Sequence, residues 1–328
     1  MPHHWLAALL VLPCASWAAP RTQVHYVMGT YLRITADGAG AAAAMTDCFR
    51  DARRLDDVFS RWSDTSELSR LNAAAPGAQV MSADMAGLLT RSLEMSAATD
   101  GAFDVRVGPL TALWRRPVPP AESEVAAARA AAGSDAVRIR GDRVVLAAGA
   151  RLDFDGIAKG WAVDACAARL RAADVKSALV SLGESSLFAL GAPAGEPRWR
   201  LAVRGPDPTT MVGWLALRDA GASVSATYGS EGKRAGHVAH VLDPHTGRPL
   251  ADDTVAVVVA PSATDAEAWT KALLVWGRDG VPRVRVAGAT AAIHVAADAI
   301  RADVAAPAVT WEPLAAPRIL AAREEPLR

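Results

Sequence analysis

Apolar residues recur along the chain with two spacings, one typical of strands and the other typical of helices. Alternating apolar and polar residues over 24–36 predict a single strand. Apolar positions three and four residues apart predict helices over 41–60, 83–99, 122–132, 161–173 and 265–276, and residues 66–72 are expected to form a short helix or turn. Short apolar or β-branched runs predict further strands over 137–152 (a pair), 178–182, 188–189, 199–204, 213–218, 236–242 and 255–260, and near Arg283 and Ala291.

The order of these elements indicates the fold class. Strands and helices are mixed without strict strand–helix–strand alternation, so we expect an α+β fold rather than a parallel α/β sheet. Ser82 and Asp265 stand where helix N-caps are expected. We expect a signal peptide at 1–18, one domain over 19–313, and a tail over 314–328 that is rich in Pro and Ala and has no clear period.

Composition excludes two classes of protein. The chain has 328 residues, of which 51% are hydrophobic, whereas disordered chains are usually poorer in apolar residues. Lys plus Arg and Asp plus Glu both number 35, which gives a formal net charge of 0. Proteins that bind nucleic acid without sequence preference are usually strongly basic, so we expect a globular protein that binds no nucleic acid.

The N-terminus resembles a secretory signal. Residues 5–12 form a short apolar run, and the small residues before and at Ala18 fit a cleavage site, which predicts export to the periplasm. Pro13 precedes Cys14 where a lipoprotein signal has a small residue, so we do not expect lipidation. The apolar run is too short for a membrane-spanning helix, and no later stretch is long enough.

Cleavage would leave two cysteines, Cys48 and Cys166, both within predicted helices. They can form a disulfide only if the fold brings them together, which the sequence does not show. We interpret them as two small buried residues, because two cysteines are too few for a disulfide-built scaffold or a cysteine zinc site.

The segment 153–160, DFDGIAKG, is a first candidate for chemistry. Gly156 and Gly160 flank Lys159 where a strand leads into a helix. Glycines allow close backbone approach, and a helix N-terminus presents free N–H groups to an anion. The spacing is not that of a Walker A phosphate loop, and taken alone the segment is better explained as an ordinary connection with two turn glycines.

Two turns carry further polar groups. His240 and Asp243 lie in HVLDPHTG, which suggests either a rigid turn beside a cleft or a solvated hairpin end. On a strand His237 and His240 would point to opposite faces, so we expect no joint metal site. Phe103 and Asp104 follow the turn Asp100-Gly101. An aromatic ring can stack on a heterocycle and a carboxylate can accept from it, but taken alone the segment is a common loop.

The order of the motifs resembles the ApbE family, the FAD:protein FMN transferases, from about Val24 to Gly277. The matching segments are Met28–Thr30, Phe59–Trp62, Ser66–Asn72, Gly101–Asp104, Gly108–Leu110, Leu152–Asp164, Val180–Gly183, His240–Leu250 and the helix that ends before Gly277.

This resemblance implies a specific chemistry. The α+β fold would have a sheet core and hold FAD in a cleft, with a divalent cation, usually Mg²⁺. The FMN half of FAD would be transferred to a Thr or Ser hydroxyl of an acceptor flavoprotein, with release of AMP. Some members instead hydrolyse FAD to FMN and AMP. Members are often periplasmic, and here we expect membrane association only through a partner.

The resemblance also implies roles for individual residues. Positions matching flavin contacts are Met28, Trp62, Ala102, Phe103, Asp104, Asp153 and Lys159. Gly156 matches a position whose backbone carbonyl binds the metal, and His240 matches a histidine near the reacting phosphate, beside the turn that begins at Asp243. His240 or a nearby carboxylate is the candidate base for the acceptor hydroxyl.

The last helix departs from the family pattern Ala-Asp-Ala-x-x-Thr-Ala-Leu, in which the Asp and Thr bind the metal. Glu267 stands at the Asp position and Lys271 at the Thr position. We hypothesise that the two form an i, i+4 salt bridge and that Lys271 supplies the positive charge of a metal. Alternatively, a metal is held by Glu267, Thr270 and backbone carbonyls, with Lys271 turned away.

These departures leave a second function open. The first is an exported FAD:protein FMN transferase that modifies a partner. The alternative is a non-catalytic FAD-binding paralogue, or an FAD pyrophosphatase, with a rewired metal site.

Overall fold

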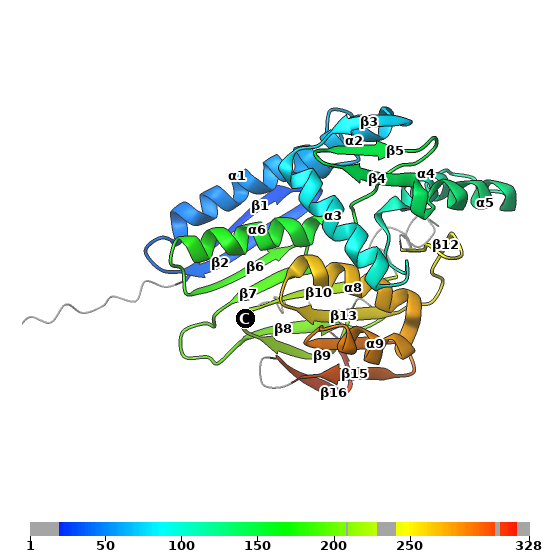
Figure 1. The fold of residues 1–328 in the computed structure, drawn as a ribbon. Coiled ribbons are helices and arrows are strands. Elements are labelled where there is room, and N and C mark those ends of the chain that lie inside the picture. Colours follow the sequence, from blue (N-terminus) through cyan, green and yellow to red (C-terminus); the bar gives the residue numbers. More distant parts are fainter. Residues whose placement is uncertain (1–19, 208, 228–240, 306–308, 320–328) are drawn as a thin grey trace, which may run out of the picture.

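The computed structural model describes residues 20–207, 209–227, 241–305 and 309–319. Within them, the largest unit is an eight-stranded sheet in the order β1-β2-β6-β7-β10-β13-β14-β15, with all neighbours antiparallel (Figure 1). Its strands are β1 (Arg21–Val27), β2 (Thr30–Asp37), β6 (Ser177–Leu182), β7 (Ser186–Leu190), β10 (Ala220–Ala226), β13 (Val255–Ala260), β14 (Ala291–Val295) and β15 (Ile300–Val304).

The other elements surround this sheet. Smaller sheets consist of β3 (Gly77–Val80), β5 (Arg143–Leu146) and β4 (Val137–Arg140), of β16 (Val309–Ile319), β9 (Thr210–Leu217) and β8 (Trp199–Arg204), and of β11 (Leu242–Asp243) and β12 (Arg248–Pro249). The helices are α1 (Ala41–Phe59), α2 (Glu67–Ala73), α3 (Ala83–Ala98), α4 (Gly108–Trp114), α5 (Glu122–Ala131), α6 (Ala158–Ala172), α8 (Ala263–Trp276) and α9 (Gly280–Val286). None of these described helices has the length and apolarity needed to cross a membrane.

The large sheet is covered on both faces, which confirms the α+β expectation. Helices α1, α6 and α8 pack on one face, and the sheet β16-β9-β8 packs on the other. Strand β13 shows the consequence, because all its residues are buried: Val258 faces the helices and Val257 faces the small sheet. A strand covered on both sides is apolar throughout rather than alternating.

Several local predictions are confirmed and others are wrong in detail. The Ser82 hydroxyl accepts from the Met85 N–H at 3.2 Å and caps α3, as expected. The N-cap of α8 is Ser262, whose hydroxyl accepts from the N–H of Asp265, the residue expected to be the cap. The strand expected over 24–36 is a hairpin, because Met28 turns the chain with a positive φ of 51°. Such left-handed residues match the twist of tight hairpins.

Other elements also differ from the prediction. Helix α6 begins at Ala158 rather than at residue 161, so Lys159 lies in its first turn. Arg283 lies in α9, not in a strand, and β15 had no predicted counterpart. Strand β16 pairs with β9 on both sides of the boundary expected at residue 313. Most of the strand expected over 236–242 lies outside the described residues.

Helices α1 and α6 are joined by a disulfide between Cys48 and Cys166, whose Cα atoms are 4.9 Å apart. The interpretation of these cysteines as two unpaired buried residues was therefore wrong. The bond links positions 118 residues apart, and only the packing of the two helices brings them together.

Removing this disulfide is expected to destabilise the protein. The double variant Cys48→Ala/Cys166→Ala should lose about 2–4 kcal/mol of unfolding free energy, since a crosslink that closes a long loop restricts the unfolded chain. Urea unfolding of the variant and of the oxidised and reduced parent measures this. A reduced parent that unfolds at the same urea concentration as the oxidised one would contradict the expectation.

Candidate active site

The candidate site is built where α6 and α8 lie against each other. Gly160 in α6 permits this contact, because a Cβ atom there would lie 2.6 Å from the carbonyl oxygen of Ala263 in α8. The Asp164 carboxylate accepts from the Ala263 N–H at 2.8 Å and from the Thr264 N–H at 2.9 Å. The Asp164 side chain of α6 therefore caps the start of α8 and fixes the relative position of the two helices.

Enlarging Gly160 should disturb this arrangement. Gly160→Ala is expected to cost about 1–3 kcal/mol of stability, because its methyl group meets backbone atoms that cannot move aside singly. Gly156→Ala is the matched control, since a Cβ there meets side-chain atoms only at 3.7 Å, an ordinary contact distance. Thermal unfolding of both variants tests this, and equal midpoints would contradict it.

Glu267 is the fully buried acid of the site, with 0% of its surface exposed. Its Oε2 accepts from the Gly160 N–H at 3.0 Å, and its Oε1 accepts from the Ser186 hydroxyl and lies 3.7 Å from Lys159 Nζ. Burial alone would raise the pKa of Glu267, but the charges of Lys159 and Lys271 hold it below the ordinary value. The acid therefore stays ionised.

Lys271 does not form the expected salt bridge with Glu267. Among the described residues, the ion-pair partner of Glu267 is Lys159, and the Lys271 ammonium donates instead to the Ser225 hydroxyl at 2.8 Å. Burial lowers the pKa of Lys271 to about 8, an effect that Glu267 opposes. At neutral pH the side chain is therefore still mostly a cation.

The sequence-predicted metal and flavin positions meet around Lys271. Its Cε atom and the Phe103 ring atom Cε2 both lie 3.7 Å from the point where Gly156 would carry a Cβ. The Thr270 hydroxyl donates to the Glu267 carbonyl oxygen at 2.8 Å and lies 3.3 Å from the Ser225 hydroxyl. The fold thus gathers residues that are more than one hundred positions apart in the chain.

This donor set does not fit a divalent metal. Mg²⁺ requires oxygen ligands in near-octahedral geometry. Here both Glu267 oxygens and the Thr270 hydroxyl already form hydrogen bonds within the protein. The position where the family pattern has a metal-binding Thr carries the Lys271 ammonium, which repels a cation. In the part of the chain that the structure describes, no group of three or more His, Cys, Asp or Glu is arranged to hold a metal ion.

Arg61 organises the other side of this region, and sequence reasoning gave it no role. Its guanidinium lies 2.7 Å from Asp153 and 2.5 Å from Asp155. The neighbouring Trp62 is 73% exposed, and the Arg115 guanidinium lies 4.1 Å from the centre of its ring. Arg61 stands inside the Phe59–Trp62 motif, but the motif does not indicate that Arg61 pairs with Asp153, which lies 92 residues later in the chain.

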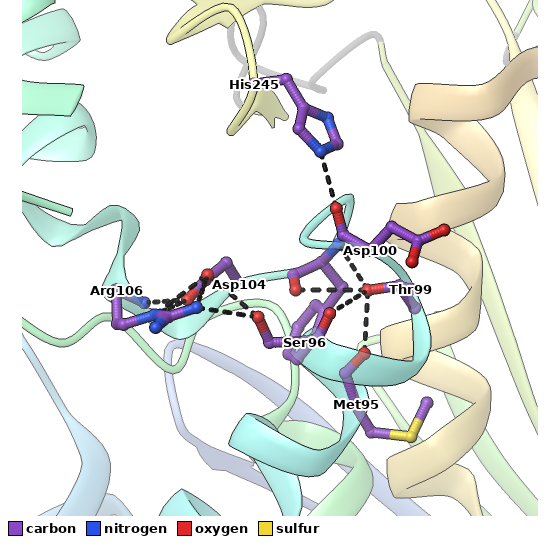
Figure 2. Close-up of polar contacts among 8 residues, drawn as sticks. Met95, Ser96, Thr99, Asp100, Asp104, Arg106 and His245 are labelled. Atoms are coloured by element: carbon purple, nitrogen blue, oxygen red, sulfur yellow. Dashed lines mark hydrogen bonds and ion pairs between the residues drawn. The ribbon is translucent and has the colours of Figure 1, made fainter. Parts of the chain in front are cut away.

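The turn that begins at Asp243 docks on the turn at Asp100, as Figure 2 shows for His245. The ring Nε2 of His245 lies 2.8 Å from the Asp100 carbonyl oxygen. The Asp243 carboxylate accepts from the His245 N–H at 2.8 Å and from the Thr246 hydroxyl at 3.0 Å. Asp243 thus shapes the turn, while His240 lies outside the described residues.

The segment around Phe103 is positioned by hydrogen bonds to neighbouring residues of the protein. The Thr99 hydroxyl donates to the Met95 carbonyl oxygen (Figure 2). It also accepts from the Phe103 N–H at 3.1 Å. Ala102 and Phe103 are buried. The Asp104 carboxylate accepts from the Arg106 side chain and from Ser96, so its oxygens already have partners.

Met28 occupies the tip of the β1–β2 hairpin. Its N–H donates to the Asp56 carboxylate of α1 at 3.1 Å, which ties the hairpin to the helix layer. Burial raises the pKa of Asp56, while this hydrogen bond lowers it. The sequence motif located Met28 but not the aspartate that holds it.

The comparisons with known proteins agree with this arrangement. The model of the ApbE family matches residues 28–293, which is most of the chain. The chain belongs to the ApbE family. A FAD:protein FMN transferase of Salmonella typhimurium is 31% identical over 300 residues, covering 83% of this chain and 85% of the relative. One of Escherichia coli K12 is 30% identical over 283 residues, covering 78% of each.

Solved ApbE structures share the fold. The apo Pseudomonas stutzeri flavinyl transferase ApbE superposes with a TM-score of 0.75 at 26% identity, over 87% of this chain and 94% of that one. A Thermotoga maritima ApbE protein gives 0.78 at 24% identity, over 86% and 96%. Family and fold class were therefore predicted correctly.

Proposed function

We propose that the protein is a FAD:protein FMN transferase, which moves the FMN moiety of FAD onto a Thr or Ser hydroxyl of an acceptor flavoprotein. The reaction class comes from relatives about 30% identical to this chain, which are FAD:protein FMN transferases. Within the structure, the supporting observation is the cluster in which two ammonium groups face one carboxylate beside Gly156 and Phe103. Such an excess of positive charge suits the pyrophosphate of a dinucleotide.

The reaction is a substitution at phosphorus. The acceptor hydroxyl oxygen forms a bond to the FMN phosphorus, the bond from that phosphorus to the bridging oxygen breaks, and AMP leaves. The hydroxyl proton passes to His240, the candidate base. Lys159, in the first turn of α6, would balance the charge that develops on the phosphate oxygens.

The test uses the mature chain, FAD and an acceptor flavoprotein domain. Covalent flavin fluorescence on a denaturing gel, with AMP released in equal amount, is the expected result, and an acceptor whose Thr is changed to Ala is the control. Formation of FMN and AMP without labelling would indicate a pyrophosphatase instead. Bound FAD with neither product would indicate a non-catalytic FAD-binding paralogue.

We also propose that the protein is exported to the periplasm. The apolar run at 5–12 and the small residues at Ala18 support this, as does the Cys48–Cys166 disulfide, since disulfides persist mainly outside the reducing cytosol. The acceptor would then be periplasmic or face the periplasm. Mass spectrometry of protein from the periplasmic fraction tests the proposal, and a chain found only in the cytosol with an intact N-terminus would contradict it.

A further inference from the structure

We propose that Lys271, together with Lys159, binds the pyrophosphate of FAD directly and replaces a divalent cation, so that FAD binding does not depend on metal. The inference rests on the proposed function for the identity of the ligand. It adds that this chain supplies the positive charge from its own side chains.

The charge balance supports a site for an anion. The buried Glu267 carboxylate neutralises one positive charge, while Lys159 and Lys271 bring two. One positive charge therefore remains beyond that of Glu267, and Asp155, another carboxylate that acts on Lys159, is also paired with Arg61. A pyrophosphate diester carries two negative charges and has several oxygens, so it can accept from both ammonium groups.

The accessible donors support the same conclusion. Lys159 is not sealed in, because 25% of its side chain is exposed. The contact of Lys271 with Ser225 uses one of the three N–H bonds that an ammonium offers. Both lysines therefore keep donors for a ligand that enters beside Gly156.

The position of Lys271 explains why it acts on the ligand and why a metal is excluded. Its Cε atom lies 3.7 Å from the point where Gly156 would carry a Cβ, and so does a ring atom of Phe103. Gly156 is the residue whose carbonyl was expected to bind the metal. The ammonium donates to Ser225, which also contacts Thr270, so its observed position is against β10. A divalent ion next to Gly156 would face this cation.

The experiment is a titration of FAD onto the mature chain, followed by flavin fluorescence, in EDTA and again in excess Mg²⁺. We expect dissociation constants that agree within about twofold. Binding that is at least about tenfold tighter with Mg²⁺ would overturn the inference while leaving the proposed function intact. Failure to bind FAD in either buffer would overturn both.

Two variants sharpen the test. In EDTA, Lys271→Met should weaken FAD binding by about tenfold or more, because a charge-assisted contact is lost. Lys176→Met is the matched control, since Lys176 is an exposed lysine paired with its sequence neighbour Asp174, and the variant should bind FAD as the parent does. Circular dichroism and the unfolding midpoint confirm that each variant is folded.

Lys271→Thr provides a test in the opposite direction. It removes the ammonium and adds a hydroxyl oxygen, a ligand type that Mg²⁺ accepts, so FAD binding by this variant should become stimulated by Mg²⁺. If both Lys271→Met and Lys271→Thr bind FAD in EDTA as tightly as the parent, Lys271 does not contact the pyrophosphate and the inference is wrong.

Discussion

Replacing His240 by Ala is expected to slow FMN transfer by about 10²–10⁴-fold, the usual contribution of a general base. The acceptor hydroxyl is a weak nucleophile while protonated, and the variant lacks the group proposed to take its proton. FAD binding should change little, because the lysine cluster that is proposed to hold the pyrophosphate is untouched. Single-turnover labelling of the acceptor, followed on a denaturing gel, measures the rate.

His245 supplies the matched control for this prediction. It is a histidine of the same turn region, but its ring contacts the Asp100 carbonyl oxygen and lies 3.3 Å from Asp243, so its interactions are with the protein. His245→Ala should slow transfer by less than about tenfold, because it loosens the turn without removing the base. Equal losses in the two variants would show that the turn, not His240, limits the reaction.

Replacing Glu267 by Gln is expected to lower the unfolding free energy by about 3–5 kcal/mol, the range found when one partner of a buried ion pair is removed. The amide keeps the shape of the side chain, but leaves Lys159 without its ion-pair partner and the partly buried Lys271 without the opposing carboxylate charge. The hydrogen bonds from Gly160 and Ser186 would also lose a charged acceptor. Urea unfolding at neutral pH measures the difference.

Two further variants separate charge from packing. Glu267→Gln/Lys271→Met should recover part of the loss, since removing opposite buried charges together costs far less than removing one. Glu94→Gln is the surface control, because Glu94 pairs with Arg91 at an exposed site, where such pairs contribute about 0–1 kcal/mol. A Glu267→Gln variant no less stable than Glu94→Gln would contradict the account of the buried cluster.

Local chemistry made much of the fold predictable. The helical spacing over 41–60 and 83–99 gave α1 and α3 to within one residue, and Ser82 marked the start of α3 correctly. The strand pair around Gly141 was also predicted. Errors fell where two patterns resemble each other. The hairpin of β1 and β2 was predicted as one long strand, because apolar and polar residues alternate on both sides of its two-residue turn, Met28-Gly29, and only Gly29 of the two favours a turn.

In the site, too, the sequence indicated which residues are close in the chain but not which distant residue becomes the partner. The sequence placed Glu267 and Lys271 four residues apart on one helix, and the pair was expected to meet. In the fold, α6 approaches α8 at Gly160, and Lys159, more than one hundred residues earlier, takes the position beside Glu267. Lys271 is thereby left to contact Ser225 of β10.

The sequence by itself determined the family, the α+β class and most single elements, because these depend on residue order and on spacings of a few positions. Tertiary structure alone decided which distant groups meet: Cys48 with Cys166, Arg61 with Asp153, and Glu267 with Lys159. The physical reason is that a side chain's partner depends on how elements pack, and one small residue such as Gly160 sets that distance without leaving a periodic signal.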